Sequence, residues 1–302
     1  MSIIKELNYI PNNSARNLKR SSSKSIGIFV LGQYNLFFAE IIEVIEHEVS
    51  LKGYSAVIHF HQNPKNAVES AAQFVLEKKL AGLIYLGGVI SKKDEGYIKR
   101  VDVPVVFSST IVEEDVDMNL FSSVGINEKT AVNEVINYLV GLGHKKIALI
   151  TEDKEERGAA QERFEVYKSA LKNNGIEYRS NYIEVGDFSI KSGFECMKRL
   201  LKNNSDITAV FAVNDLMAIG AIKAVYSEGL IVPQNISVVG FDGLEFGEYY
   251  QPSLTTVKQP SSEFGKISTS LLFNLVETDS ASEHIILDTK FTIRESCQKI
   301  IR

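Results

Sequence analysis

The sequence predicts an α/β protein made of two doubly wound parallel-sheet domains with a ligand cleft between them. Three observations predict this fold class: short apolar strand segments alternate with helical segments, the connections are short, and the alternation runs through the chain twice. Strands that are apolar on both faces require helices on both sides, as in a buried parallel sheet. With 302 residues and 44% hydrophobic content, the chain is long enough to bury two such cores.

The first series of elements begins with the apolar strand SIGIFVL at residues 25–31. Apolar residues then recur at helical spacing from Phe38 to Val49, and this helix ends near Gly53. Further strands are expected at 55–60, 82–86 and 104–107, with helical stretches around 66–79 and 91–100.

A second series is expected to begin near Val124. Its first helix spans 128–142 and ends at Gly141 and Gly143. The remaining strands are predicted at 146–151, 182–185, 209–213 and 237–241, and the helices at 157–174, 190–202 and 215–228.

The residues before the first strand differ from the rest in charge. Residues 1–24 carry five basic side chains against one acidic one, a local charge of +4, which leaves −9 for residues 25–302 of a chain whose net charge is −5. A basic tip on an acidic body directs contacts with nucleic-acid phosphates to the tip. Asn12 or Asn13 can cap a short helix that bears Leu18 and basic residues, and such a helix is marginal without a partner.

This order of motifs resembles the LacI/GalR family of bacterial transcription repressors. Pro-Asn-x-x-Ala-Arg-x-Leu from Pro11, a basic serine-rich spacer and Ser-Ile-Gly-Ile from Ser25 are similar to the family's hinge helix and first core strand. The pattern A-V-N-D-x-M-A-x-G at 212–220 is the most specific match. The alternative for the hinge motif is a solvated linker with an incidental leucine.

The resemblance implies a periplasmic-binding-protein-like architecture with a discontinuous division of the chain. Residues 1–24 are a remnant of a helix-turn-helix domain followed by the hinge. Residues 25–126 with 258–287 form the first domain, and 127–257 with 288–302 form the second. The base-reading helices are not in this sequence, so we expect operator DNA as a partner only in a full-length form. The resemblance also implies a homodimer whose DNA-contacting hinge residues are Asn13, Ser14, Ala15, Arg16, Leu18 and Lys19.

The same resemblance nominates residues that bind a small-molecule effector. They lie where strands of open α/β sheets end, which is where such folds bind ligands. The candidates are Phe37, Phe38, Arg157, Arg163, Phe188, Asn214, Asp215 and Asp242. Alternatives exist for each type: Phe37 fits better as a core residue, and Asn214 or Asp215 can cap a helix. Arg163 can instead be an exposed charge paired with Glu155, Glu156 or Glu162. As the stronger hypothesis, Arg163 and Asp215 face the ligand and tolerate substitution without loss of fold.

Ile126 stands where many family members have an aspartate, so the effector class is open: a sugar, a sugar derivative or a nucleobase-type ligand. No cofactor is expected. His59 and His61 face one side of a strand but lack a third ligand nearby in sequence, so no metal site is predicted. The chain has no nucleophile, phosphate-loop or metal-protease motif, which argues against an enzyme.

The remaining expectations concern location. Two cysteines, no run of 18 apolar residues and no apolar signal segment predict a cytoplasmic protein that does not interact with membranes. The alternative function is the substrate-binding protein of a sugar transporter, which shares the two-domain cleft but has no use for the basic hinge motif.

Overall fold

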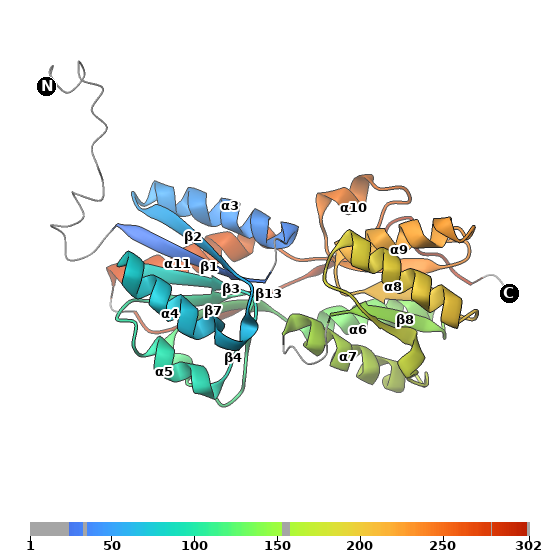
Figure 1. The fold of residues 1–302 in the computed structure, drawn as a ribbon, viewed down its shortest axis with the longest axis horizontal. Coiled ribbons are helices and arrows are strands. Elements are labelled where there is room, and N and C mark those ends of the chain that lie inside the picture. The colour runs from blue at the N-terminus through green and yellow to red at the C-terminus, as the bar shows by residue number, and fades with distance from the viewer. Residues whose placement is uncertain (1–23, 33–34, 153–157, 279, 301–302) are drawn as a thin grey trace, which may run out of the picture.

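Two sheets, each covered by helices, lie next to each other along the long axis of the molecule (Figure 1). The structure is a computed structural model, and it describes residues 24–32, 35–152, 158–278 and 280–300. In this part of the chain each of the two sheets has six strands. The prediction of two α/β domains with parallel sheets is therefore confirmed.

The first sheet has the strand order β13-β7-β5-β3-β1-β2, with every pair parallel. Helices α3 and α11 pack on one face, and α4 and the short α5 pack on the other. The strands are β1 (Ser25–Leu31), β2 (Ser55–His61), β3 (Gly82–Leu86), β5 (Val105–Ser108), β7 (Ser122–Ile126) and β13 (His284–Leu287). The helices are α3 (Leu36–Leu51), α4 (Ala67–Lys78), α5 (Glu95–Ile98) and α11 (Ser261–Glu277). The two-residue strands β4 (Val89–Ile90) and β6 (Ile111–Val112) pair beside this sheet.

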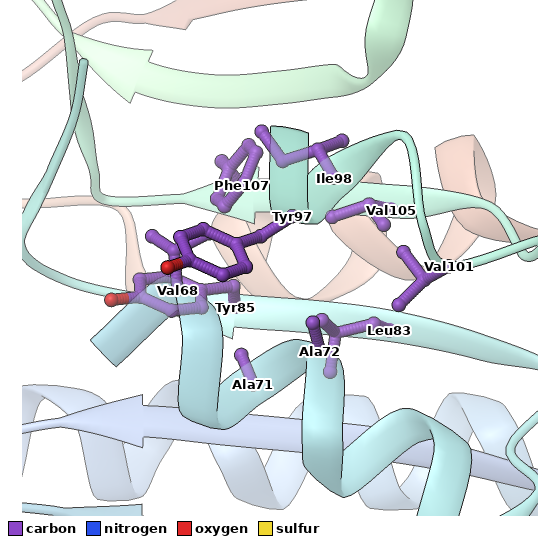
Figure 2. Close-up of a pocket in the computed structure, with 10 residues that line it drawn as sticks. All are labelled: Val68, Ala71, Ala72, Leu83, Tyr85, Tyr97, Ile98, Val101, Val105 and Phe107. Carbon is purple, nitrogen blue, oxygen red and sulfur yellow. The ribbon is translucent and has the colours of Figure 1, made fainter. Parts of the chain in front are cut away.

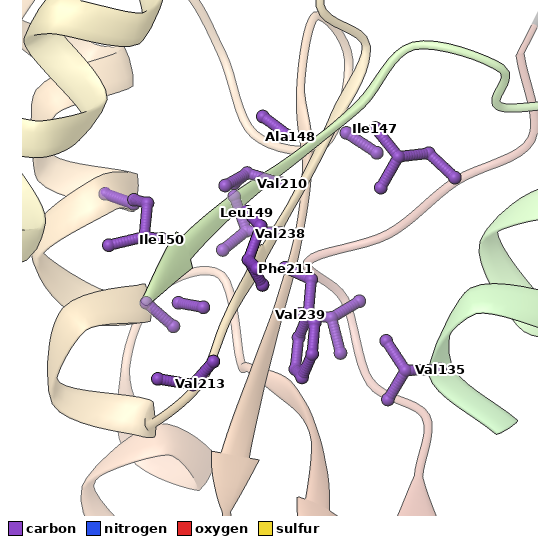
Figure 3. Close-up of a cluster of buried hydrophobic side chains, with 14 of the residues drawn as sticks. Val135, Ile147, Ala148, Leu149, Ile150, Val210, Phe211, Val213, Val238 and Val239 are labelled. Carbon is purple, nitrogen blue, oxygen red and sulfur yellow. The ribbon is translucent and has the colours of Figure 1, made fainter. Parts of the chain in front are cut away.

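The second sheet has the order β14-β12-β11-β10-β8-β9, parallel except for β14, which runs antiparallel to β12. Its central strands are fully buried, and their valine, isoleucine and phenylalanine side chains form the core seen in Figure 3. The strands are β8 (Ile147–Thr151), β9 (Ile183–Val185), β10 (Ala209–Ala212), β11 (Ser237–Asp242), β12 (Thr255–Lys258) and β14 (Lys290–Thr292). The helices are α6 (Glu128–Gly141), α7 (Ala159–Asn173), α8 (Ile190–Asn203), α9 (Asp215–Ser227) and the short α10 (Glu245–Tyr249).

Two glycines allow α8 and α9 to pack with their backbones in contact. A Cβ atom on Gly193 would collide with the backbone of Met217, and one on Gly220 would collide with the carbonyl of Ile190. Glycine is the residue that permits so close an approach. This packing fixes α9, whose amino end carries Asn214 and Asp215.

The chain passes between the sheets three times. It leaves the first sheet after β7, where the Asn127 side chain caps α6, returns after β12 into α11, and crosses again between β13 and β14. The expectation that the second series begins near Val124 is wrong, because β7 pairs with β5 and β13 of the first sheet. An apolar strand followed by a helix has the same sequence pattern in either sheet, so only strand pairing distinguishes the two.

Candidate functional site

Arg163 is a buried cation held by a carboxylate from another helix. It lies near the start of α7 with 5% of its surface exposed. Its Nε and Nη2 donate to the two carboxylate oxygens of Glu128 at 2.8 and 2.9 Å, and Nη1 donates to the carbonyl of Val213 at 2.7 Å. The guanidinium also stacks 3.5 Å from the centre of the Phe241 ring. Arg163 is thus not an exposed helical charge, because burial forces it to pair within the protein.

Asn214 and Asp215 start α9 and perform different tasks there. The Asn214 side-chain oxygen caps the helix by accepting from the Met217 N–H at 2.9 Å, and its amide nitrogen donates to the Phe188 carbonyl at 3.0 Å. Asp215 is fully buried and accepts from the Thr256 hydroxyl at 2.6 Å and the Leu244 N–H at 2.7 Å. A Cβ atom on Gly240 would collide with the Asp215 carboxylate. Asp215 therefore ties α9 to the segments that follow β11 and contain β12.

Burial also changes the protonation of this carboxyl group. Desolvation raises the pKa of Asp215 from 3.8 to about 7, although the hydrogen bonds from Thr256, Leu244 and Gly243 act in the opposite direction. Replacing a group with this burial and these partners is expected to destabilise the protein. The hypothesis that Arg163 and Asp215 can be substituted without loss of fold stays a prediction, and the burial and partners of both side chains argue against it.

Asp242 ends β11 in a left-handed conformation, with φ of 118°, and is 5% exposed. Its Oδ1 accepts from the Gln259 side-chain amide at 2.8 Å, and its backbone carbonyl accepts from the Gln259 N–H at 3.0 Å. Burial raises the pKa of Asp242 well above its usual value, while the charge of Arg163 acts in the opposite direction. Gln259 directly follows β12, so this pair lies where the chain crosses from the second sheet into α11.

Four buried oxygen atoms in this region have no hydrogen-bond partner within the part of the chain that the structure describes. They are Thr151 Oγ1, Gln161 Oε1, Asp242 Oδ2 and Gln259 Oε1. Thr151, Asp242 and Gln259 stand at or just after the ends of parallel strands, and Gln161 is in the first turn of the helix after β8. All four thus belong to the carboxyl edge of the second sheet. Buried acceptors without partners are costly and rare, so their concentration at one edge indicates a place for a ligand that donates hydrogen bonds.

The first domain approaches this edge with apolar groups. Leu244, two residues after Asp242, is buried in the same apolar cluster as Phe37 and Phe264 of the first domain. Phe37 is 2% exposed and packs edge-on against Phe264, so it is a core residue. Phe38 is half-buried and lies against Gly87 at the end of β3. The polar edge therefore lies at the junction of the two domains.

The predicted site residues do not all lie at this edge of the second sheet. The structure brings Arg163, Asn214, Asp215, Asp242 and Phe188 to one edge, whereas Phe37 and Phe38 belong to the other domain. Phe188 is half-buried in a left-handed conformation, with φ of 63°. Arg157 and the hinge residues Asn13, Ser14, Ala15, Arg16, Leu18 and Lys19 lie outside the described residues.

Four residues of this region are absent from the candidates that the sequence predicts: Thr151, Gln161, Gln259 and Glu128. The first three are common polar residues next to element ends and have no distinguishing pattern. Glu128 follows the capping residue Asn127, where an acidic side chain is ordinary because it suits the helix dipole. Only the fold brings Glu128 to Arg163.

A second candidate region is a small cavity inside the first domain (Figure 2). Its lining is apolar apart from the hydroxyls of Tyr85 and Tyr97 and comes from α4, α5, β3, β5 and nearby residues. The Tyr85 hydroxyl is buried without a partner among the described residues, and burial raises its pKa. No carboxylate, imidazole or cation lines the cavity, so it lacks groups for specific recognition of a polar ligand.

Comparisons with known proteins agree with the two-domain fold. The model of the periplasmic binding protein-like domain matches residues 136–297. The HTH-type transcriptional regulator MalR of Clostridium butyricum is 40% identical over 99% of this chain and 90% of its own length. The chain belongs to the LacI/GalR family of transcription regulators. A probable repressor of Bacillus subtilis, ExuR, is 31% identical over 99% of this chain and 89% of its own length.

Solved structures of LacI-type regulators share the fold. The Lac repressor dimer bound to operator and the anti-inducer ONPF has a TM-score of 0.81 and 27% identity, and the match covers 96% of this chain and 100% of that one. The regulator CelR in complex with cellobiose has a TM-score of 0.78 and 26% identity over 97% of this chain and 88% of that one. The periplasmic-binding-protein-like fold and the regulator function are thus confirmed, and the transporter alternative is not favoured.

The curated relatives are transcription regulators rather than enzymes. Among the described residues no helix is long and apolar enough to cross a bilayer, and no group of three or more histidine, cysteine or acidic side chains is placed to hold a metal ion.

Proposed function

We propose that the effector of this LacI/GalR-type regulator is a neutral carbohydrate bound at the junction of its two domains. The observation that carries the proposal is the group of four buried oxygens without partners at the carboxyl edge of the second sheet. Sugar hydroxyls supply hydrogen-bond donors for such acceptors. Structural relatives support a carbohydrate: CelR is in complex with cellobiose, a Lac repressor is bound to ONPG, and the CcpA of Weissella paramesenteroides has bound glucose.

The proposed site combines two kinds of contact. Asp242 and Asn214 offer polar atoms from the second domain, and Gln259 offers one from the crossover that follows β12. The half-buried rings of Phe38 and Phe188 suit the apolar face of a sugar. Arg163 and Asp215 act as the buried supports of this edge, and Arg157 completes the proposed set. Phe37 contributes by holding Phe38 against the first domain.

The control of DNA binding follows from where the site lies. A ligand that contacts both domains favours one of two arrangements of the domains and thereby changes their populations. We propose that the hinge, with Asn13 to Lys19, transmits this change to operator DNA in the bacterial cytoplasm. Coupling of this kind is reciprocal, so operator DNA changes effector affinity by the same factor.

We also propose that the functional unit is a homodimer that uses the aromatic face of α10. Phe246 and Tyr249 lie three residues apart on this helix and are 64% and 78% exposed. Aromatic residues are enriched at protein–protein interfaces, so this pair is a candidate contact for a second copy of the chain. Light scattering should give a dimer mass for the wild type and a monomer mass for Phe246→Asp. Leu76→Asp, at an exposed leucine of α4, is the matched control, and a wild-type monomer at micromolar concentration contradicts the proposal.

A thermal-shift screen of the purified chain tests the carbohydrate assignment. Neutral monosaccharides and disaccharides, their phosphate esters, nucleobases and nucleosides are compared at equal concentration. A ligand at 100 times its Kd stabilises the folded state by about 2.7 kcal/mol, which is measurable as a rise in Tm. We expect a neutral sugar to raise Tm and nucleobases to have no effect. A response to nucleobases alone contradicts the assignment.

A further inference from the structure

We propose that Glu128 determines the specificity of this site by filling the guanidinium fork of Arg163, so that anionic effectors such as sugar phosphates and sugar acids are excluded. This inference rests on the proposed function, since it concerns the same site. In this proposal Glu128 does not touch the ligand, but it determines whether the site accepts a neutral or an anionic ligand.

The geometry leaves Arg163 no vacant fork for an anion. A guanidinium binds phosphate or carboxylate best through two parallel N–H groups. Here Glu128 already takes the parallel pair on Nε and Nη2, at 2.8 and 2.9 Å, and both side chains are about 95% buried. Nη1 is used by the Val213 carbonyl, and the ring of Phe241 covers one face of the guanidinium. An anion therefore has to displace a buried, charged hydrogen-bonded partner.

The neighbouring ionisable groups are carboxyls, which do not attract an anion whether they are protonated or ionised. Asp242 interacts electrostatically with Arg163, Asp215 and Glu128, and the partly buried Glu162 interacts with both Glu128 and Arg163. The positive charge of the buried Arg163 is thus balanced by Glu128, and the carboxyl groups of Asp242 and Glu162 also interact with it. With the charge of Arg163 compensated, an entering phosphate meets no net positive potential in a region of low dielectric.

Hydrogen-bond chemistry leads to the same conclusion. Gln259 Oε1 and Gln161 Oε1 are acceptors only, and Asp242 Oδ2 is an acceptor whenever the group is ionised. A phosphate dianion brings only acceptors, whereas every sugar hydroxyl brings a donor. Glu128 and the unpaired oxygens therefore select together for a neutral, hydroxyl-bearing ligand.

The decisive variant is Glu128→Gln, which keeps the size of the side chain and removes its charge. Isothermal titration measures the binding of inorganic phosphate, glucose 6-phosphate and glucose to the wild type and the variant. We expect the two phosphates to bind the variant at least tenfold more tightly than the wild type, because the Arg163 charge is no longer compensated. Glu134→Gln, at an exposed position of the same helix, should match the wild type. Equal phosphate affinity in the wild type and Glu128→Gln overturns the proposal.

A measurement on the wild type covers the case in which the variant does not fold. Each neutral sugar that stabilises the protein is compared with its own phosphate ester and its own sugar acid. Binding of the charged derivatives at least 100-fold weaker supports the proposal, and binding within threefold overturns it. Failure of every neutral sugar contradicts the proposed function instead, while the phosphate titration of Glu128→Gln still reports on Glu128.

Discussion

The carboxyl edges of the two sheets differ in polarity: the edge of the second sheet is polar and that of the first is mainly apolar. At the second sheet, four buried ionisable side chains, Arg163, Glu128, Asp215 and Asp242, lie within a network of hydrogen bonds that leaves four oxygens without partners among the described residues. At the first sheet, the corresponding positions hold Phe37, Phe38 and the glycines that follow β3.

Polar groups at the first edge are small and satisfied by their neighbours. The Ser108 hydroxyl accepts from Ser268 at 2.9 Å, and Thr110 donates to the carbonyls of Gly87 and Ser108. The difference suggests a division of labour: the second domain recognises a ligand by hydrogen bonds, and the first domain provides an apolar surface against which the ligand packs. Substitutions at the two edges should then have different consequences.

The largest expected effect is that of Arg163→Met. The substitution leaves the Glu128 carboxylate buried without its partner, and breaking a buried ion pair in this way costs about 3–5 kcal/mol of the free energy of unfolding. Urea denaturation of the variant and the wild type at pH 7 measures the difference. A loss of less than about 1 kcal/mol would show that Glu128 finds solvent or another partner easily.

The double variant Arg163→Met with Glu128→Leu serves as a control. It replaces both charges by apolar groups of similar size, so much of the lost stability should return. If the double variant is as unstable as the single one, the packing of Arg163 on Phe241 matters more than its charge.

Sequence patterns predicted the fold class because it depends on periodicity and burial, and the apolar runs of both sheets carry this signal directly. They also placed residues such as Asp242 and Asn214 at strand ends. Sequence patterns did not predict which side chains of different helices and strands contact each other. Glu128 and Arg163 are 35 positions apart, and Asp215 and Thr256 are 41 apart, so their contacts depend on which strands lie side by side. The burial of Arg163 follows from these contacts and not from the amphipathic pattern of α7.

A smaller effect is expected in the pH dependence of stability. Burial raises the pKa of Asp215 from 3.8 to about 7, so between these values the folded protein keeps a proton that the unfolded chain has released. The contribution of Asp215 to stability therefore falls as pH rises from about 4 to about 7, by at most about 1.4 kcal/mol per pH unit, and is constant above pH 7. Asp242 contributes with the same sign.

Asp215→Asn tests this sign, because the amide does not titrate. Urea denaturation at pH 5, 6, 7 and 8 should show a shallower decline of the unfolding free energy for the variant than for the wild type. Asp187→Asn is the control: hydrogen bonds from Ser189 and Ser192 lower the pKa of this exposed carboxyl, so its effect is confined to acid pH. A variant that follows the wild-type profile between pH 5 and 7 contradicts the assignment to Asp215.

The smallest effect on folding is expected at the apolar edge, where Phe38→Ala separates binding from stability. Phe38 is only half-buried and lies at the surface of its cluster, so its loss should lower the unfolding free energy by less than Phe37→Ala, which removes a core ring at a cost of about 3–5 kcal/mol. If the first domain provides the surface on which the sugar packs, Phe38→Ala should still weaken sugar binding by about two- to tenfold, through loss of about 0.5–1.5 kcal/mol of ring contact. Titration calorimetry with the sugar identified by thermal shift measures this loss, and Phe38→Tyr should restore the affinity because it restores the ring. If Phe38→Ala binds the sugar as the wild type does, then the ligand is held by the second domain alone, and the division of labour between the two edges is wrong.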